Sequence, residues 1–143
     1  MKEVNFRKLC TSSGKDVICG KNAEQNELVV AQSGDSEAVI HTLAAGSPFC
    51  NIKGKATKDD IKEAAVYCAA FSKTWKSHHS DIVVHIFKGK DIFKDAEMKI
   101  GTFGVRKAKE IIVKKKDIEA FLGASDFTRQ KRLNIASGVA SKK

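Results

Sequence analysis

The chain has 143 residues, enough to bury the core of one compact domain, and its 42% hydrophobic content with a single proline argues against extensive disorder. No apolar run approaches the ~20 residues needed to span a bilayer, and the N-terminal MKEVNFRKLC lacks the apolar middle section of a signal peptide. We therefore expect a cytoplasmic protein without membrane contact. The formal net charge of +9 favours polyanionic partners such as RNA or DNA.

The positive charge is unevenly distributed along the chain. Residues 86–116 hold ten lysines and arginines against four acidic residues, and residues 123–143 hold five against one. The first 85 residues are close to neutral, so we expect the polyanion footprint in the C-terminal half. We assign residues 1–122 to one folded domain and residues 123–143 to a basic, flexible tail.

The first half of the chain alternates short strands with one helix. Ser12-Ser13-Gly14 is a plausible hairpin turn between two strands, and Ser33-Gly34-Asp35 ends a predicted helix. A second pair of strands is joined through Ala45-Gly46-Ser47. The predicted elements are strands at 5–12 and 15–19, a helix at 23–32, and strands at 38–44 and 48–53.

The clearest helical pattern follows. Apolar residues from Ile61 to Trp75 recur at three- and four-residue spacing, which predicts one long helix over 57–77 with Thr57 as its N-cap. We expect its apolar stripe to be buried against a sheet.

The remaining elements complete an α+β fold. Residues 81–87 form a nearly continuous apolar run, which predicts a central strand buried on both faces. A strand at 110–113 and a short helix at 117–122, ended by Gly123, come next. We expect a single compact domain, in which a mixed, mainly antiparallel β-sheet packs against one long and one or two short helices.

Four cysteines are scattered without any C-x-x-C spacing: Cys10, Cys19, Cys50 and Cys68. In a cytoplasmic protein this pattern predicts reduced, mostly buried thiols, and it supplies no cluster of zinc ligands.

Gly20-Lys21-Asn22 stands directly before the helix predicted at 23–32. With Gly14 it superficially resembles a Walker A loop, but five residues separate the two glycines and Asn22 replaces the magnesium-binding hydroxyl, so nucleotide hydrolysis is rejected. A capping box explains two residues, because Asn22 would cap the helix while Gln25 reaches back to its amide. Lys21 is left over, and a lysine beside a helix N-terminus is also a ready anion site. The two interpretations are compatible.

No catalytic or metal-binding set is recognisable. His78 and His79 are expected at a helix end, where the dipole favours imidazolium, and His85 is expected as a satisfied histidine of a buried strand. A metal site needs three or four converging ligands, and no serine or cysteine lies in a nucleophile elbow. We expect a non-enzymatic protein with no cofactor and no metal.

The lysines of the C-terminal half surround KIGTFGVRK, residues 99–107, which combines glycines, one aromatic residue and a basic pair. The single Trp and the single Tyr both fall in the long predicted helix, so a row of stacking aromatics is not expected. Backbone-directed phosphate binding remains.

Together these pieces resemble NFACT-R, the RNA-binding module of the NFACT proteins, which serve in ribosome-associated quality control. The most specific match is Gly20-Lys21-Asn22-Ala23-Glu24-Gln25-Asn26, and the others are Ile40-His41, Gly46-Ser47, Ala69-Ala70-Phe71-Ser72-Lys73, Ile92-Phe93-Lys94 and Gly101. The likeness covers about residues 6–122. It departs from the family pattern at Val39-Ile40, where the family has an aromatic pair, and at Pro48, where it has a second histidine.

The resemblance implies a stand-alone module that binds tRNA or rRNA, or the ribosome, and it makes the Lys21-Asn22 stretch a functional surface. A protein-interaction adaptor with an acidic partner, or a DNA-binding module, would use the same basic surface and stays open as an alternative. The candidate RNA-binding residues are Lys21, Asn22, Gln25, Asn26, His41, Ser47, Lys73, Lys94, Arg106 and Lys107.

Overall fold

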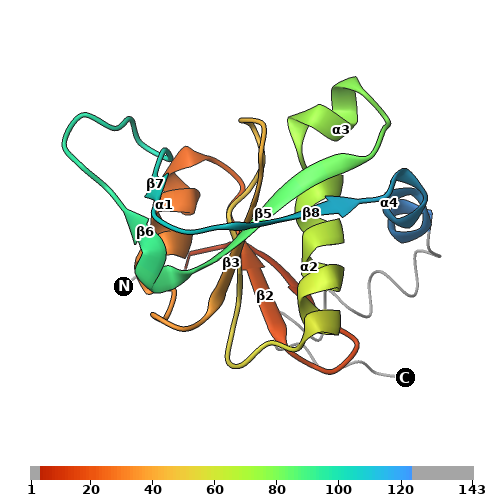
Figure 1. Ribbon diagram of the computed structural model, residues 1–143, viewed down its shortest axis with the longest axis horizontal. Helices are drawn as coiled ribbons and strands as arrows, with labels where there is room; N and C mark the ends of the chain where they lie inside the picture. The colour runs from red at the N-terminus through yellow and green to blue at the C-terminus, as the bar shows by residue number, and fades with distance from the viewer. Residues whose placement is uncertain (1–3, 124–143) are drawn as a thin grey trace.

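The computed structural model describes residues 4–123. A mainly antiparallel sheet and its helices form one compact α+β domain, as predicted (Figure 1). In chain order the elements are β1 (Arg7–Cys10), β2 (Asp16–Cys19), α1 (Ala23–Gln32), β3 (Ala38–Thr42), β4 (Cys50–Ile52), α2 (Lys58–Ala70), α3 (Lys73–Ser77), β5 (Ile82–Lys88), a 3₁₀ turn (Gly89–Asp91), β6 (Ile92–Phe93), β7 (Gly104–Val105), β8 (Lys109–Val113) and α4 (Lys115–Leu122).

The main sheet has six strands in the order β1-β2-β4-β3-β5-β8, and every neighbouring pair is antiparallel. β6 and β7 form a separate two-stranded ribbon. Because β2 pairs with β4, the segment that leads into α1 lies beside the segment that leads into β4, and the Gly20 amide donates to the Phe49 carbonyl at 3.1 Å. Residues nearly thirty positions apart in the chain are thereby brought together.

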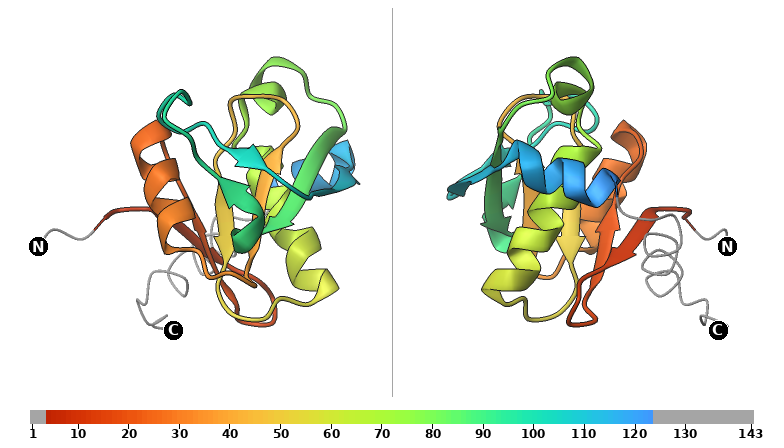
Figure 2. Two further views of the ribbon diagram at one scale, coloured as in Figure 1. Left: turned by 60° about the vertical axis from the view of Figure 1, so that its left-hand side comes forward. Right: turned by 90° about the vertical axis from the view of Figure 1, so that its right-hand side faces the viewer.

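Two apolar clusters lie on opposite faces of this sheet. Figure 2 shows α1 on one side of the sheet and α2 on the other, with α4 lying across α2. On β3 the side chains alternate in the way a strand requires. Ile40 belongs to the cluster beneath α2 and α4, while Val39 packs with Val29 of α1 and with Phe49 and Phe87. The second cluster forms the base on which the candidate site is built.

The long helix predicted over 57–77 is two helices in the structure, α2 and α3. The backbone of Ser72 is extended, and its buried hydroxyl donates to the Ala69 carbonyl while accepting from the Trp75 amide. The amide of Lys73 binds the Gly46 carbonyl at 2.9 Å instead of continuing the helix. The apolar spacing did continue through this break, and Trp75 is buried as expected. Spacing alone therefore could not reveal the change of direction.

Strand β5 lies inside the sheet, and the prediction that it is buried on both faces is only partly correct, because Phe87 is buried on the second face but Val83 and His85 are half-buried. Ile82 and Val84 are buried under α2, whereas His85 is half-buried on the opposite face. The imidazole of His85 pairs with the exposed Glu110 carboxylate of β8, with Nε2 and Oε2 3.0 Å apart. His85 is therefore not a core histidine, because its face of the sheet is only partly covered.

The four cysteines are all buried, but the prediction that all are reduced is wrong. Cys19 of β2 and Cys50 of β4 are direct partners across the two strands and form a disulfide. The two cysteines meet because β2 pairs with β4. Their separation in the sequence gives no indication of that strand pairing. Cys68 stays a thiol, and its burial raises its pKa to about 12.

The turn after α1 is fixed by one carboxylate. Glu37 accepts from the amides of Gly34 and Gly54 at 2.8 and 2.9 Å and from the Lys53 ammonium at 2.8 Å. Burial raises the pKa of Glu37, but these hydrogen bonds outweigh it and lower the pKa to about 2.

Several smaller predictions are confirmed. The hairpin of β1 and β2, the bounds of α1 and the end of α4 at Gly123 are as expected. Thr57 caps α2 in a reciprocal capping box with Asp60. No helix within residues 4–123 is both long and apolar enough to cross a membrane. The predicted tail lies almost wholly outside the described residues.

Candidate functional site

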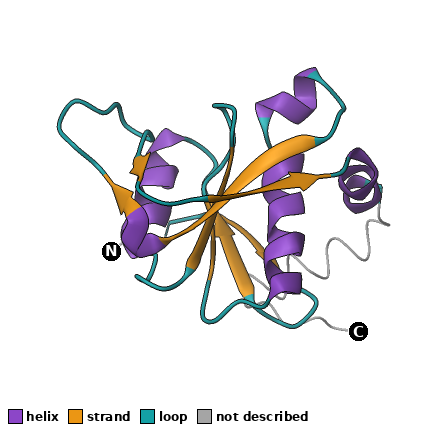
Figure 3. Cartoon of the chain, viewed as in Figure 1, coloured by secondary structure: helices purple, strands orange, loops and turns teal. Residues whose placement is uncertain are grey.

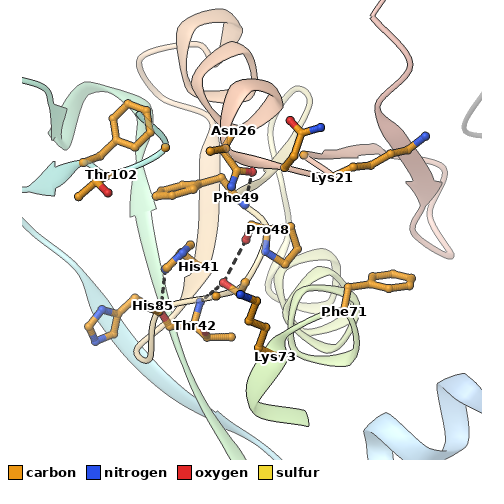
Figure 4. A pocket seen from close by; sticks show the side chains of 18 of the residues that line it. Lys21, Asn26, His41, Thr42, Pro48, Phe49, Phe71, Lys73, His85 and Thr102 are labelled. Atoms are coloured by element: carbon orange, nitrogen blue, oxygen red, sulfur yellow. Dashed lines mark hydrogen bonds between the residues drawn. The ribbon is translucent and has the colours of Figure 1, made fainter. Parts of the chain in front are cut away.

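A cleft of about 750 Å³ opens where β3 ends and β4 begins. Its walls come from segments that are far apart in the chain, and Figure 4 shows side chains from several of them around one space. The lining residues fall in residues 20–26, 41–49, 71–76 and 100–105, with Arg7, His85 and Phe87. Six of the ten predicted site residues line it: Lys21, Asn22, Asn26, His41, Ser47 and Lys73.

Four cationic side chains line the cleft, and no aspartate or glutamate does. Lys21, Lys73 and Lys76 are exposed, and none of them forms an ion pair with any residue from 4 to 123. The Arg7 guanidinium lies 4.0 Å from the centroid of the Phe71 ring, and burial lowers the pKa of Arg7. A half-buried cation of this kind gains from a nearby anion, because it has lost part of its hydration.

Aromatic rings form the floor of the cleft. The buried Phe49 ring lies 4.3 Å from the His41 ring and makes edge contacts with Phe87 and Phe103, at centroid distances of 6.3 and 5.1 Å. Leu43 and Ile100 also line the cleft, and each is 57% exposed. Apolar surface therefore reaches solvent beside the cationic side chains.

The stretch from Gly20 to Asn26 begins α1 and also borders the cleft. Asn22 Oδ1 caps the helix by accepting from the Gln25 amide at 2.8 Å. Gln25 reaches back one residue further than the predicted capping box, because its Oε1 accepts from the Lys21 amide at 3.0 Å. A side chain at Gly20 would collide with Asn26, so the close approach of the two segments requires glycine there. The capping leaves the Lys21 ammonium available at the cleft.

Two of the predicted RNA-binding residues hold the cleft together from within. Asn26 is buried, and its Oδ1 accepts from the Phe49 amide at 3.0 Å, so its side-chain oxygen is used inside the protein. Ser47 is also buried; its hydroxyl accepts from the Thr42 amide at 3.0 Å and donates to the Pro48 carbonyl. Both side chains fix the backbone between β3 and β4.

His41 contributes a neutral ring to the floor. Its Nδ1 lies 2.7 Å from the Thr42 carbonyl oxygen, which can only accept, so Nδ1 carries the proton. Burial lowers the pKa of His41, and the neighbouring His85 acts in the same direction. At neutral pH the imidazole is uncharged, and His41 belongs with the aromatic floor rather than with the cationic side chains.

Lys94 does not line the cleft, but it holds in place the loop whose residues 100–103 form one wall. Figure 3 shows the connection between β6 and β7 as a long loop. The Lys94 ammonium holds that loop, since Nζ donates to Glu27 Oε2 of α1 at 2.6 Å and to the carbonyls of Lys99 and Thr102 at 2.5 and 2.8 Å. The hydrogen bond from Lys94 is the largest cause that lowers the pKa of Glu27. All three ammonium donors of Lys94 are used inside the protein.

Gly101 completes this attachment of the loop to α1. Its amide donates to the same Glu27 oxygen at 2.6 Å, and its φ of +80° is in the region that favours glycine. A Cβ at Gly101 would lie 2.8 Å from the Ala23 Cβ. The loop can lie this close to α1 only because residue 101 has no side chain.

Three further predicted residues do not line the cleft. The Arg106 guanidinium lies 5.0 Å from the centroid of the Phe93 ring, and Lys107 is exposed. The Gln25 side chain is used in the cap and in a hydrogen bond to the Asn5 carbonyl at 3.3 Å.

Sequence reasoning missed Arg7, Lys76 and the role of Phe49. The sequence did hold one indication of Lys76, because it lies three residues after the predicted site residue Lys73 and shares a face with it in a helix. Arg7 gave no signal, since only the pairing of β1 with β2 and the position of Phe71 bring it to the cleft. All four cations of the cleft precede residue 77, whereas the excess of positive charge follows residue 85. Among residues 4–123, no three potential metal ligands gather together.

The chain is similar to known proteins in sequence and in fold. A family model described as NFACT protein RNA binding domain matches residues 3–107. The solved C-terminal part of the fibronectin/fibrinogen-binding protein from Streptococcus suis is similar in fold, with a TM-score of 0.72 and 21% identity over 84% of this chain. The match spans 50% of that protein's solved chain. No curated protein matches.

Proposed function

Because the chain belongs to the family of NFACT RNA-binding domains, we propose that it binds tRNA or rRNA through the phosphates that its cleft attracts. The observation that carries this proposal is the lining of the cleft, which includes Arg7, Lys21, Lys73 and Lys76 and no carboxylate. Such a surface attracts both polyanions and acidic proteins, but several cations that form no ion pair within residues 4–123 suit the regularly spaced charges of a nucleic-acid backbone best.

The domain acts by binding, not by chemistry, and works in the cytoplasm in translation or ribosome-associated quality control. Phosphate contacts of this kind set the position and orientation of a protein on RNA without selecting sequence. The family supports RNA as the ligand class; the choice of tRNA or rRNA is our proposal. Fibronectin or fibrinogen binding is not transferred from the Streptococcus suis protein, because 21% identity supports a common fold alone.

Fluorescence anisotropy with labelled tRNA and a labelled rRNA stem-loop tests the proposal. The double variant Lys21→Ala, Lys73→Ala removes two cleft cations, and Lys58→Ala, Lys62→Ala removes two exposed lysines of α2 that do not line the cleft. We expect the cleft variant to bind both RNAs more weakly and to reduce the slope of log affinity against log salt by about 2, since each lost phosphate contact removes about 1. The α2 variant should match the unmodified protein.

Wild-type affinity in a folded cleft variant would refute the proposal. Equal affinity for DNA of the same sequence would point instead to a general nucleic-acid module. Binding of an acidic protein that persists at high salt would favour the adaptor interpretation.

A further inference from the structure

The cleft presents two chemically different surfaces to one space. In Figure 4, Lys21, Phe71 and Lys73 lie on one side of Phe49 and His41, and Thr102 lies on the other. The cationic side is suited to phosphate, whereas the floor and the opposite rim are aromatic and aliphatic. A phosphate backbone alone would use only the cationic side and would leave the exposed apolar rim in water.

The apolar side is open enough to receive a flat ring. Ile100 is 57% exposed, and the half-buried Phe103, whose ring makes an edge contact with Phe49 and lies 4.7 Å from the Lys94 ammonium, also lines the cleft. Unpaired bases gain affinity by stacking on aromatic side chains such as Phe103, roughly 5- to 150-fold per base, and an exposed aliphatic side chain such as Ile100 adds apolar contact. The neutral His41 extends the uncharged floor, so a base there would not meet a buried charge.

Two polar groups are placed to contact the edge of a base. The Asn22 carboxamide uses its oxygen in the helix cap, while its NH₂ group makes no hydrogen bond within residues 4–123. The Thr102 hydroxyl likewise makes no side-chain hydrogen bond to any described residue, although the Thr102 carbonyl accepts from Lys94. Both residues line the cleft. A donor on one rim and a hydroxyl on another can bind the edge of a base that lies between them.

We infer that the cleft holds one unpaired nucleotide of an RNA strand, with its base against the apolar side and its flanking phosphates on the cationic side. This inference rests on the proposed function and makes it more specific. The cleft volume of about 750 Å³ falls within the ~300–1,000 Å³ typical of small-ligand sites. A base in a continuous duplex is stacked and paired, so it cannot enter, and a duplex would touch the rim alone. The domain therefore selects single-stranded, looped or bulged RNA.

Binding by charge alone and binding of an unpaired nucleotide predict opposite orders of affinity for a duplex and a single strand. A duplex has the higher charge density, and the salt dependence per phosphate contact is about 0.9 for duplex DNA against about 0.7 for a single strand. A cleft that bound phosphates alone would therefore favour the duplex. We expect a 12-nucleotide single strand to bind at least ~5-fold more tightly than the same strand annealed to its complement.

Two matched substitutions separate stacking from charge. Ile100→Ala shortens an apolar side chain at the cleft rim, and Ile112→Ala shortens one that is 59% exposed on β8, away from the cleft. Ile100→Ala should lower single-strand affinity ~3-fold or more with no change in duplex affinity, because it removes apolar surface that a base would cover, and Ile112→Ala should change neither. Phe103→Leu should act in the same direction as Ile100→Ala. A second test does not depend on the folding of Phe103→Leu. Strands in which one nucleotide at a time is replaced by an abasic residue should bind the unmodified protein more weakly.

The outcomes distinguish this inference from the proposed function. The nucleotide site is refuted if the duplex binds as tightly as the single strand. It is also refuted if Ile100→Ala and the abasic strands bind normally while the double variant Lys21→Ala, Lys73→Ala binds more weakly. In that second case phosphate binding by the cleft stands. If the lysine variant also binds normally, both fail. Saturation of the cleft by AMP or UMP at the affinity of the oligonucleotide would overturn the assignment to an RNA strand and indicate a free-nucleotide site.

Discussion

Replacing Lys94 by methionine tests whether this lysine contacts RNA or supports the wall of the cleft. The substitution keeps the apolar stem and removes the ammonium that binds Glu27 and the Lys99 and Thr102 carbonyls. A hydrogen bond to a charged group contributes about 1.5–3 kcal/mol. The two charged side chains are 32% and 29% exposed, so water replaces part of what is lost. We expect a loss of about 2 kcal/mol in the free energy of unfolding, less than the sum of the separate bonds.

For a domain of this size that loss corresponds to a fall of roughly 6–10 °C in melting temperature. Thermal unfolding followed by circular dichroism measures it. Lys107→Met is the matched control, because Lys107 is exposed and forms no ion pair within the described residues, and it should stay within about 0.5 kcal/mol of the unmodified protein. Glu27→Gln should destabilise in the same way, and the double variant should lose less than the two single losses added together.

The contrary result is equally clear. If Lys94 bound RNA directly, Lys94→Met would melt with the control and would flatten the dependence of RNA affinity on salt by about 1. Equal melting temperatures for the Lys94 and Lys107 variants would refute the structural role assigned to Lys94.

Four further predictions follow from packing, covalent structure and ionisation. Asn26→Ala should lower the free energy of unfolding by about 1–3 kcal/mol, because it leaves a buried backbone amide without its acceptor; an unchanged denaturant midpoint would contradict this. Trp75→Ala should cost about 3 kcal/mol or more as a large-to-small change at a buried position, which a melting curve will show. Alkylation of the unfolded, unreduced protein should label two thiols, and four after reduction, because Cys19 and Cys50 are joined; four labels without reductant would refute the disulfide. The pKa of Glu37 is lowered from 4.5 to about 2, so its stabilisation is present above pH 4.5 and is lost as the pH falls towards 2; the unmodified protein should lose more stability than Glu37→Gln between pH 5 and 2, as measured by urea unfolding.

The local pattern of the sequence was sufficient for most of the elements. Alternation and turn residues located the β1–β2 hairpin, and the Asn22 cap and the Ser33-Gly34-Asp35 break gave the bounds of α1. The motif of residues 20–26 supported the NFACT-R resemblance, which the family match confirms. These features depend on neighbours in the chain, so a single sequence is enough to recognise them.

The features that depend on strand order were not predictable in the same way. The Cys19–Cys50 disulfide and the position of Arg7 follow from the β1-β2-β4 arrangement. The break at Ser72 arises because the Gly46 carbonyl takes the Lys73 amide, a contact between distant segments. None of these contacts has a periodicity that could indicate it.

Counting charge along the chain also gave an incomplete view of the site. Lys94 belongs to the lysine-rich segment, yet its charge is used to bind Glu27 and the loop. The cleft draws its cations from the nearly neutral first 85 residues, because Arg7, Lys21, Lys73 and Lys76 converge there while the carboxylates of the same part lie elsewhere. Local arrangement, more than net charge, determines where a polyanion can bind.

An NMR titration of ¹⁵N-labelled protein with the 12-nucleotide single strand tests most directly whether the cleft is the RNA-binding site. We expect the largest amide shifts on cleft residues, including Lys21, Gly46, Lys73 and Thr102, and little change in the exposed N-terminal turn of α2 or at Ile112 of β8. Shifts centred on Arg106, Lys107 and β8, with the cleft amides unmoved, would contradict it.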